Sequence, residues 1–177
     1  YFVIFGWMIF LVITLYIDFF KLLISPSYYE GLKVVPIVLI ANLLLGIYYN
    51  QSVWYKVIDK TKYGAYQSLI GAAVTLLINI VFIPKYGYMA SAVACCLCFL
   101  TMVVISYIWG RKYNPIPYNL KEIVLYSASA LIIFVISELI PVENKVIKIS
   151  INTLLILSYI ALIYNKCIKP ILANRRR

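Results

Sequence analysis

The sequence is dominated by long runs that contain no charged residue. Four such runs cover residues 1–17, 34–55, 63–83 and 86–110. A helix needs about 20 mostly apolar residues to cross the roughly 30 Å hydrocarbon core of a bilayer, and the runs approach or reach that length. Because they are continuous rather than alternating, they favour helices over the strands of a membrane β-barrel. The chain is therefore predicted to be an all-α membrane protein.

Two later segments extend the predicted set of helices. Residues 123–140 contain Glu138 as their one charged residue, and residues 149–165 contain none. The first helix is expected to continue past Asp18 to about Leu23. A composition of 64% hydrophobic and 12% charged residues exceeds what a soluble domain of 177 residues could bury. We predict a polytopic membrane protein with about six transmembrane helices.

The basic residues fall unequally on the two sides of this predicted membrane protein. Eleven of the 16 Lys and Arg residues lie on one side, and cytoplasmic loops carry an excess of such residues. We therefore expect the carboxyl terminus in the cytoplasm, and we ascribe the net charge of +10 to this topology and to anionic membrane lipid rather than to nucleic acid. The larger group is Lys56, Lys60, Lys62, Arg111, Lys112, Lys121, Lys166, Lys169 and Arg175 to Arg177, and the smaller group is Lys21, Lys33, Lys85, Lys145 and Lys148.

The amino terminus of the sequence does not have the features of a natural start. Residue 1 is Tyr and lies inside a predicted helix, without an initiator Met or the cleavage site of a signal peptide. We expect the chain to be the carboxyl-terminal part of a longer protein.

The sequence offers few residues for enzymatic chemistry. It has no His and only six carboxylates, none of them in an obvious acid/base pair. The absence of His excludes Ser-His-Asp triads and His-containing zinc sites within this chain. Three of the four cysteines, Cys95, Cys96 and Cys98, lie inside one apolar run, where they are expected to pack rather than bind a metal. We predict no catalytic residue, no metal site and no cofactor.

Uncharged polar residues mark one face of two predicted helices. Asn42 shares a face with Gly46 and Tyr49, and Asn79 shares a face with Thr75 on the next helix. Two interpretations stay open. Small and polar side chains can pack helices against one another, or Asn42 and Asn79 can line a polar substrate cavity.

Three segments carry a resemblance to a known family. The segment "GLKVVPIVLIANLLLGIYYNQSVWYK" places Pro36 after Gly31 and Asn42 six residues later, and "NIVFIPKYGYMASAVA" contains an Asn, Pro and Gly turn that begins at Asn79. With "YIDFFKLLISPSYYEG", these segments resemble the carboxyl-terminal domain of polysaccharide biosynthesis and O-antigen oligosaccharide flippases. These belong to the multidrug, oligosaccharidyl-lipid and polysaccharide exporter superfamily. The resemblance covers residues 10–125, and Ala90 stands where the pattern has Gly.

The resemblance implies a transporter with two helical lobes around a central cavity. Residues 1–115 would supply four helices of the second lobe, and residues 116–177 two appended helices with a basic cytoplasmic tail. The missing amino-terminal lobe would belong to the same protein. The implied substrate is a polyprenyl-pyrophosphate-linked oligosaccharide, moved across the bacterial cytoplasmic membrane by alternating access, with a possible coupling ion.

The stretch "YIDFFKLLI" places a charge pair in an apolar run. Asp18 and Lys21 are three residues apart on one helical face, so they can form an ion pair. One interpretation is that Lys21 reaches to the membrane interface and Asp18 accompanies it. The other is that the pair belongs to the substrate pathway, where basic groups suit a pyrophosphate. Lys33 and Lys56 are further candidates for the pathway.

Three other classes of function remain open from the sequence. A cation-coupled drug exporter of the same superfamily would need a carboxylate deep in a helix, and Asp18 and Glu138 are the candidates. A structural membrane subunit would be favoured if the protein had only six helices. A membrane glycosyltransferase or polymerase is disfavoured, because the sequence has no long outer loop with the Arg, His and carboxylates that would bind a sugar donor.

Overall fold

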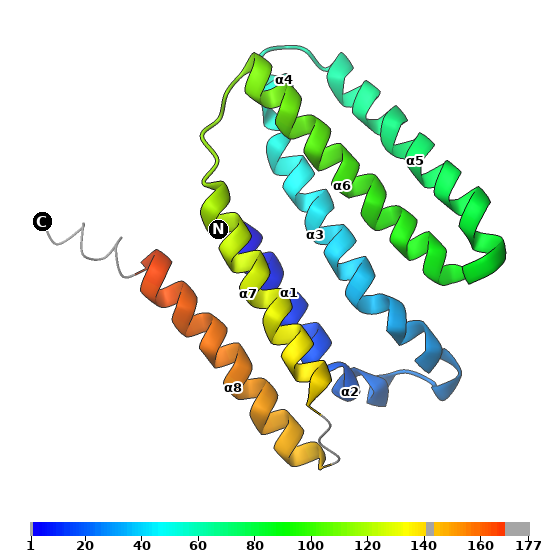
Figure 1. The fold of residues 1–177 in the computed structure, drawn as a ribbon, viewed down its shortest axis with the longest axis vertical. Helices are drawn as coiled ribbons and strands as arrows, with labels where there is room; N and C mark the ends of the chain where they lie inside the picture. Colours follow the sequence, from blue (N-terminus) through cyan, green and yellow to red (C-terminus); the bar gives the residue numbers. More distant parts are fainter. Residues whose placement is uncertain (1, 141–143, 169–177) are drawn as a thin grey trace, which may run out of the picture. The chain divides into compact units, whose positions relative to one another are not determined.

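The computed structural model describes residues 2–140 and 144–168, which form helices and no strand. Figure 1 shows the course of the chain. The predicted all-α class is therefore confirmed. The helices are α1 (Phe2–Leu15), α2 (Ile17–Phe20), η1 (Lys21–Leu23), η2 (Pro26–Val34), α3 (Val35–Gln51), α4 (Val53–Val57), α5 (Lys62–Tyr86), α6 (Tyr88–Tyr113), α7 (Leu120–Leu139), α8 (Lys145–Ile163) and η3 (Tyr164–Ile168).

Five helical segments of the described residues are long and apolar enough to cross a membrane. They are Pro26–Val57, Lys62–Tyr86, Tyr88–Tyr113, Leu120–Leu139 and Val146–Lys166, and the bent pair Phe2–Leu15 and Ile17–Leu23 makes a sixth if it counts as one span. Large apolar side chains remain exposed along these segments. On α5, for example, Leu69, Leu77 and Ile80 are 65–71% exposed, as expected for side chains that face lipid. The chain is a polytopic membrane protein.

The chain divides into two compact units, which are described separately. Unit 1 contains residues 3–29 with the described residues from Leu120 onward, and unit 2 contains residues 30–119. The sequence analysis divided the chain at residue 115 and grouped the first helix with the next three, whereas α1 packs with α7 and α8. The reason is a set of contacts between distant parts of the sequence.

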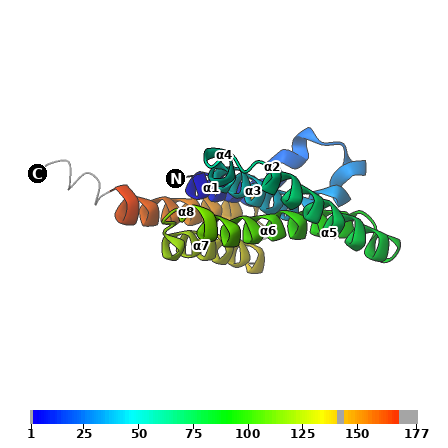
Figure 2. The same ribbon diagram turned by 90° about the horizontal axis from the view of Figure 1, so that it is seen from above.

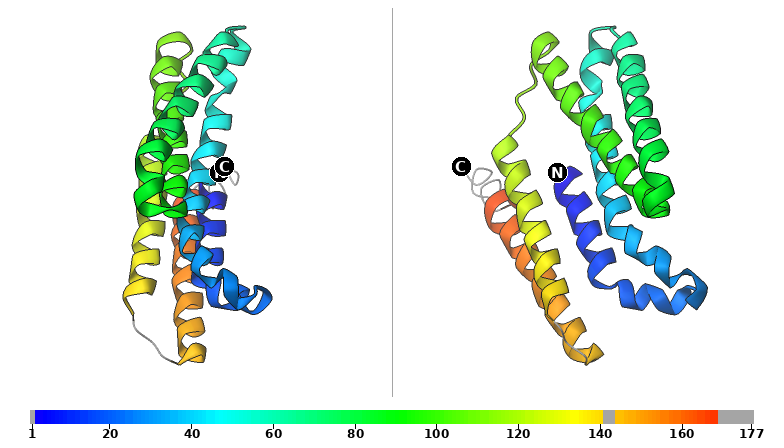
Figure 3. Two further views of the ribbon diagram at one scale, coloured as in Figure 1. Left: turned by 90° about the vertical axis from the view of Figure 1, so that its right-hand side faces the viewer. Right: turned by 45° about the vertical axis from the view of Figure 1, so that its right-hand side comes forward.

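Polar contacts join the three long helices of unit 1. Asn152 Nδ2 of α8 donates to the carbonyl oxygen of Leu15 at 2.7 Å, and Asn152 Oδ1 accepts from Ser137 Oγ of α7 at 2.9 Å. Trp7 Nε1 of α1 donates to Ser127 Oγ of α7 at 2.8 Å. Each of the three helices is therefore bonded to the other two, and Figure 3 shows α7 and α8 side by side.

The first helix bends where the sequence predicted a continuous one. The segments Phe2–Leu15 and Ile17–Leu23 meet at 61°. The amide of Phe19 bonds to the carbonyl of Tyr16 at 2.9 Å instead of continuing the ladder to Leu15. An unpaired buried carbonyl costs about 1–3 kcal/mol. Because Asn152 donates to the Leu15 carbonyl, the bend leaves no backbone acceptor unpaired at that position.

Unit 2 is built around α6, which packs against both α3 and α5. Figures 1 and 2 show these two helices running beside α6. Small buried residues of α6, Ala90, Ala94 and Cys98, allow the close approach of neighbouring backbones. Tyr48 of α3 packs with Cys98 and Met102 in one hydrophobic cluster.

At Gly71, α5 lies close to side chains of α6. A Cβ atom at this position would lie 2.8 Å from Met102 Sδ and 3.0 Å from Cys98 Sγ. Real side chains do not approach so closely without displacing a neighbour. The lack of a side chain at Gly71 therefore permits the packing of α5 on α6.

Candidate functional site

One cavity in the described part of unit 1 has a volume of about 600 Å³. This volume lies in the range of cavities that hold small organic ligands. We call it the lysine cavity, because two lysines from different helices line it. Its lining residues are Leu15, Tyr16, Asp18, Phe19, Lys21, Leu22, Tyr29, Lys148, Ile149 and Asn152.

One carboxylate in the lysine cavity holds two ammonium groups. Asp18 Oδ1 lies 2.5 Å from Lys21 Nζ, and Asp18 Oδ2 lies 3.1 Å from Lys148 Nζ. The three side chains are 39–46% exposed, so these ion pairs are open to solvent and each contributes about 0–1 kcal/mol to stability. The cluster carries one positive charge in excess, since two ammonium groups share one carboxylate.

Neutral hydrogen bonds fix the walls of the lysine cavity. The hydroxyl groups of Tyr16 and Thr153 lie 2.8 Å apart, and the Tyr29 hydroxyl donates to the carbonyl oxygen of Lys21 at 3.1 Å. The second contact ties the start of η2 to η1. The remaining wall is apolar and includes Phe19 and Leu22, which are 63% and 79% exposed. The cavity thus combines a charged region with apolar surface.

The structure brings together two of the six residues that the sequence analysis named for the substrate pathway. Asp18 and Lys21 form the predicted i, i+3 pair. Lys33 and Lys56 are exposed in unit 2, in η2 and α4, and neither lines the lysine cavity.

The two asparagines of the predicted pathway lie on different helices. Asn42 is exposed on α3 and donates from Nδ2 to the carbonyl oxygen of Val38 at 2.8 Å. Asn79 lies on α5, where its Oδ1 is buried and has no hydrogen-bond partner in the described part of the chain. The structure therefore gives Asn42 an exposed position and Asn79 a half-buried one.

Sequence reasoning missed Lys148 and Asn152, which complete the lysine cavity. Both lie in α8, more than 125 residues from Asp18 and Leu15. No local sequence pattern predicts the contacts of Lys148 with Asp18 and of Asn152 with Leu15. One signal pointed to Lys148. The charge count placed Lys148 and Lys21 on the same side of the membrane, and the shared carboxylate shows that they lie at the same end of unit 1.

The inward face of α5 includes two residues that the sequence analysis did not name. Gln67 and Gly71 are buried, and Gln67 is fully enclosed without a hydrogen-bond partner for either Nε2 or Oε1 in the described residues. Thr75, on the same face, bonds back to the carbonyl oxygen of Gly71 at 2.9 Å. The sequence drew attention to Asn79 and Thr75 but not to Gln67.

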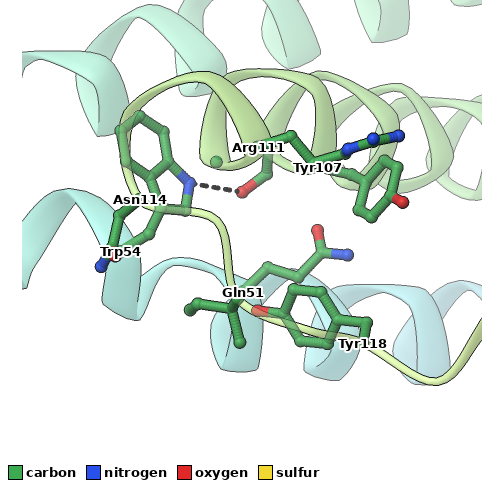
Figure 4. Close-up of a pocket in the computed structure, with 9 residues that line it drawn as sticks. Gln51, Trp54, Tyr107, Arg111, Asn114 and Tyr118 are labelled. Carbon is green, nitrogen blue, oxygen red and sulfur yellow. Dashed lines mark hydrogen bonds between the residues drawn. The ribbon is translucent and has the colours of Figure 1, made fainter.

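A second cavity, in unit 2, is too small for an organic ligand. Its volume is about 10 Å³, which is close to the minimum for one water molecule. Figure 4 shows Gln51, Arg111 and Tyr118 around it, with the bond from Trp54 Nε1 to Ser106 Oγ at 3.2 Å. Burial raises the pKa of the Tyr118 hydroxyl, so Tyr118 is a neutral donor and acceptor there. This cavity is a packing detail rather than a substrate site.

Comparison of the chain with family models, with curated proteins and with solved structures gave no match. The resemblance to oligosaccharide flippases therefore rests on the sequence segments alone. What the structure contributes independently is the geometry of the lysine cavity.

Proposed function

We propose that the chain is the carboxyl-terminal part of a transporter that flips a polyprenyl-pyrophosphate-linked oligosaccharide across the bacterial cytoplasmic membrane. Such transport would serve the synthesis of a surface polysaccharide or lipopolysaccharide. The carboxyl terminus would lie in the cytoplasm, in line with the excess of basic residues on that side. The transporter would contain an amino-terminal lobe in addition to this chain and would make or break no covalent bond.

The lysine cavity is the observation that carries this proposal. A lipid pyrophosphate has an anionic head and an apolar tail, and the cavity has two ammonium groups beside exposed Phe19 and Leu22. The substrate phosphates would replace the carboxylate of Asp18 as the partner of Lys21 and Lys148. Charge-assisted hydrogen bonds of this kind are the strong ones in proteins.

The exposed polar face of α3 supports a water-filled pathway next to unit 2. Asn42 and Asn50 are exposed, and each donates from Nδ2 to a carbonyl of its own helix, Val38 at 2.8 Å and Gly46 at 2.9 Å. These two bonds use the amide nitrogens, so the Oδ1 atoms of Asn42 and Asn50 can accept further hydrogen bonds. Exposed amides are costly against lipid, so polar groups in membrane helices generally face a cavity or another helix. In the proposed transporter this face of α3 borders the substrate pathway.

Cation-coupled drug export is the second candidate function. It would use a carboxylate that binds and releases a cation. Asp18 already holds the ammonium groups of Lys21 and Lys148, which leaves it poorly placed to bind a further cation. Glu138 is exposed near the end of α7. The geometry therefore favours an anionic substrate.

Deletion of the complete gene from its own host tests the proposal directly. We expect surface polysaccharide to be lost and lipid-linked oligosaccharide to accumulate on the cytoplasmic leaflet, measured by extraction and by access of an impermeant glycan-binding reagent. Plasmid-borne wild type should restore export. Normal surface polysaccharide together with increased sensitivity to cationic drugs would instead support the drug exporter.

A paired set of variants connects export to the lysine cavity. Lys21→Met with Lys148→Met should reduce export about tenfold or more, because each lysine supplies a charge-assisted bond to the substrate. Lys121→Met with Lys166→Met removes two exposed lysines of unit 1 outside the cavity and should leave export near wild type. Equal export in both double variants, at equal amounts of inserted protein, would contradict a role for the cavity.

Sequencing the DNA upstream of the Tyr1 codon provides an inexpensive first check. An open frame that encodes further membrane helices would supply the amino-terminal lobe. A start codon close to Tyr1 would leave one lobe, which cannot enclose a substrate cavity, and would favour a structural subunit.

A further inference from the structure

One end of unit 2 concentrates positive charge. The turn that follows α4 and the last turn of α6 meet at this end, as Figure 1 shows. Asp59 is its one carboxylate, whereas the opposite end of unit 2 has two lysines and Glu30. The basic residues of the first end are Lys56, Lys60, Lys62, Arg111 and Lys112.

Two of these lysines, Lys60 and Lys112, lie near the ring of Tyr113. Lys60 Nζ lies 4.3 Å from the centroid of the ring, within the range of a cation–π contact, and Lys112 Nζ lies 5.8 Å from it. The Tyr113 hydroxyl accepts a hydrogen bond from the Tyr63 hydroxyl at 2.7 Å. The lysines therefore form a group around one aromatic side chain.

A layer of aromatic side chains, of which Trp54 is buried, packs against Tyr113 in unit 2. The Trp54 ring stacks on the Tyr113 ring with 5.9 Å between centroids and 9° between planes. Trp54 is 1% exposed and is held by its bond to Ser106. Tyr63 also packs against Trp109, with 5.1 Å between ring centroids. We call Trp54, Tyr63, Trp109 and Tyr113, together with Lys60, Lys62 and Lys112, the aromatic–basic end.

The backbone turn after α4 places Lys60 over this layer. Asp59 has a positive φ of 55°, and the amide of Lys60 bonds to the carbonyl of Tyr55 at 2.8 Å. This combination is typical of a helix that ends with a left-handed residue. The turn reverses the chain, so that Lys60 lies against Tyr113 of α6.

Asp59 lies at this end, but among the described residues it forms no ion pair with the lysines of the aromatic–basic end. In the described residues both ion pairs involve Asp18 in unit 1. Trp and Tyr gather where membrane helices meet the lipid headgroups, and basic residues there attract anionic lipid by about 1 kcal/mol each. We propose that the aromatic–basic end binds the phosphate of an anionic phospholipid headgroup, with Lys60 and Lys112 as its ligands and Tyr113 between them.

Native mass spectrometry of the full chain in detergent tests this site with phosphatidylglycerol and phosphatidylcholine as probes. Wild type should bind phosphatidylglycerol about tenfold more tightly than phosphatidylcholine. Lys60→Gln with Lys112→Gln should abolish most of that preference. Lys33→Gln with Lys85→Gln removes the same charge from the opposite end of unit 2 and should leave the preference in place.

Three results would overturn the proposal. Equal losses in the two double variants would show a general effect of net charge. An unchanged preference in Lys60→Gln with Lys112→Gln would place the lipid elsewhere. Displacement of phosphatidylglycerol by millimolar inorganic phosphate would assign the site to a soluble anion. Circular dichroism of each variant confirms that the helices are intact before the comparison is made.

Discussion

Lys148 and Asp18 form an ion pair across 130 residues of sequence, with 3.1 Å between Nζ and Oδ2. The other oxygen of the same carboxylate pairs with Lys21. The pair connects the short helix after the bend to α8. It also means that neutralising Asp18 would release two ammonium groups at once.

Removing the charge pair formed by Asp18 of α2 and Lys21 of η1 should impair export without preventing insertion. Asp18→Asn with Lys21→Met is expected to reduce export about tenfold or more, because one of two phosphate ligands is lost and Lys148 loses its partner. Quantified surface polysaccharide measures the effect. Lys121→Met with Glu122→Gln is the matched control, since it removes one base and one acid at exposed positions of α7. Unchanged export in the Asp18 and Lys21 variant would remove the pair from the mechanism.

Replacing Asn152 should destabilise unit 1. Asn152→Leu leaves the Leu15 carbonyl and the Ser137 hydroxyl without their partner, and we expect the free energy of unfolding to fall by about 1–3 kcal/mol. Unfolding in mixed detergent micelles, followed by circular dichroism, measures it. Asn165→Leu makes the same change at an exposed position of η3 and should have little effect. Equal stability of the two variants would mean that the bend does not depend on Asn152.

A large side chain at Gly71 should disturb the packing of α5 on α6. Gly71→Ile places atoms where Met102 and Cys98 now lie and should lower the free energy of unfolding by about 1–3 kcal/mol. The same unfolding assay applies. Ala73→Ile adds a similar side chain at an exposed position of α5 and should be tolerated. If Ala73→Ile proved the more harmful, the assigned inward face of α5 would be incorrect.

The conformation of Asp59 predicts opposite effects for two substitutions. Its φ of 55° is costly for a residue with a Cβ atom and most costly for a β-branched one. We expect Asp59→Gly to match or slightly exceed wild type in thermal stability, and Asp59→Val to lose about 1–2 kcal/mol. Thr61→Val, at an ordinary helical φ of −58°, should be nearly neutral. A destabilised Asp59→Gly would show that the carboxylate, rather than the backbone, matters at this turn.

Cysteine labelling should decide the orientation of the chain. In a background without the four native cysteines, Thr61→Cys should resist an impermeant maleimide added to intact cells, and Ser27→Cys should react. Both positions are exposed, so access reports the side of the membrane rather than burial. Labelling at Thr61→Cys from outside would reverse the proposed orientation. Permeabilised cells, in which both positions should react, provide the control.

The features that could be predicted from the sequence were those that depend on residues close together in the chain. The uncharged runs predicted the spans, and the spacing of Asp18 and Lys21 predicted their ion pair. The bend after Leu15 was not predicted, because Asn152, which bonds to the Leu15 carbonyl at the bend, lies 137 residues away in the sequence. The same reason explains why Lys148 was absent from the predicted site.

The inward face of α5 shows a second limit of prediction from sequence. A membrane helix is apolar on every side, so its periodicity does not identify the side that packs against protein. The sequence analysis emphasised Thr75 and Asn79, whereas packing on α6 also buries Gln67 and Gly71. Successive residues of a helix are about 100° apart around its axis, so adjacent residues point to different sides. The closeness of Met102 to Gly71 identifies the side of α5 that packs on α6.

The sharing of one carboxylate by two lysines also has an electrical consequence. A dianionic headgroup bound beside Lys21, Lys148 and Asp18 would leave the loaded site with a net charge of about −1, since the empty cluster carries one positive charge. The membrane voltage, negative in the cytoplasm, acts on such a charge with about 2.3 kcal/mol per 100 mV across the full bilayer. Outward passage of the loaded, negatively charged site would thus be driven by the voltage, and so would inward return of the empty, positively charged site.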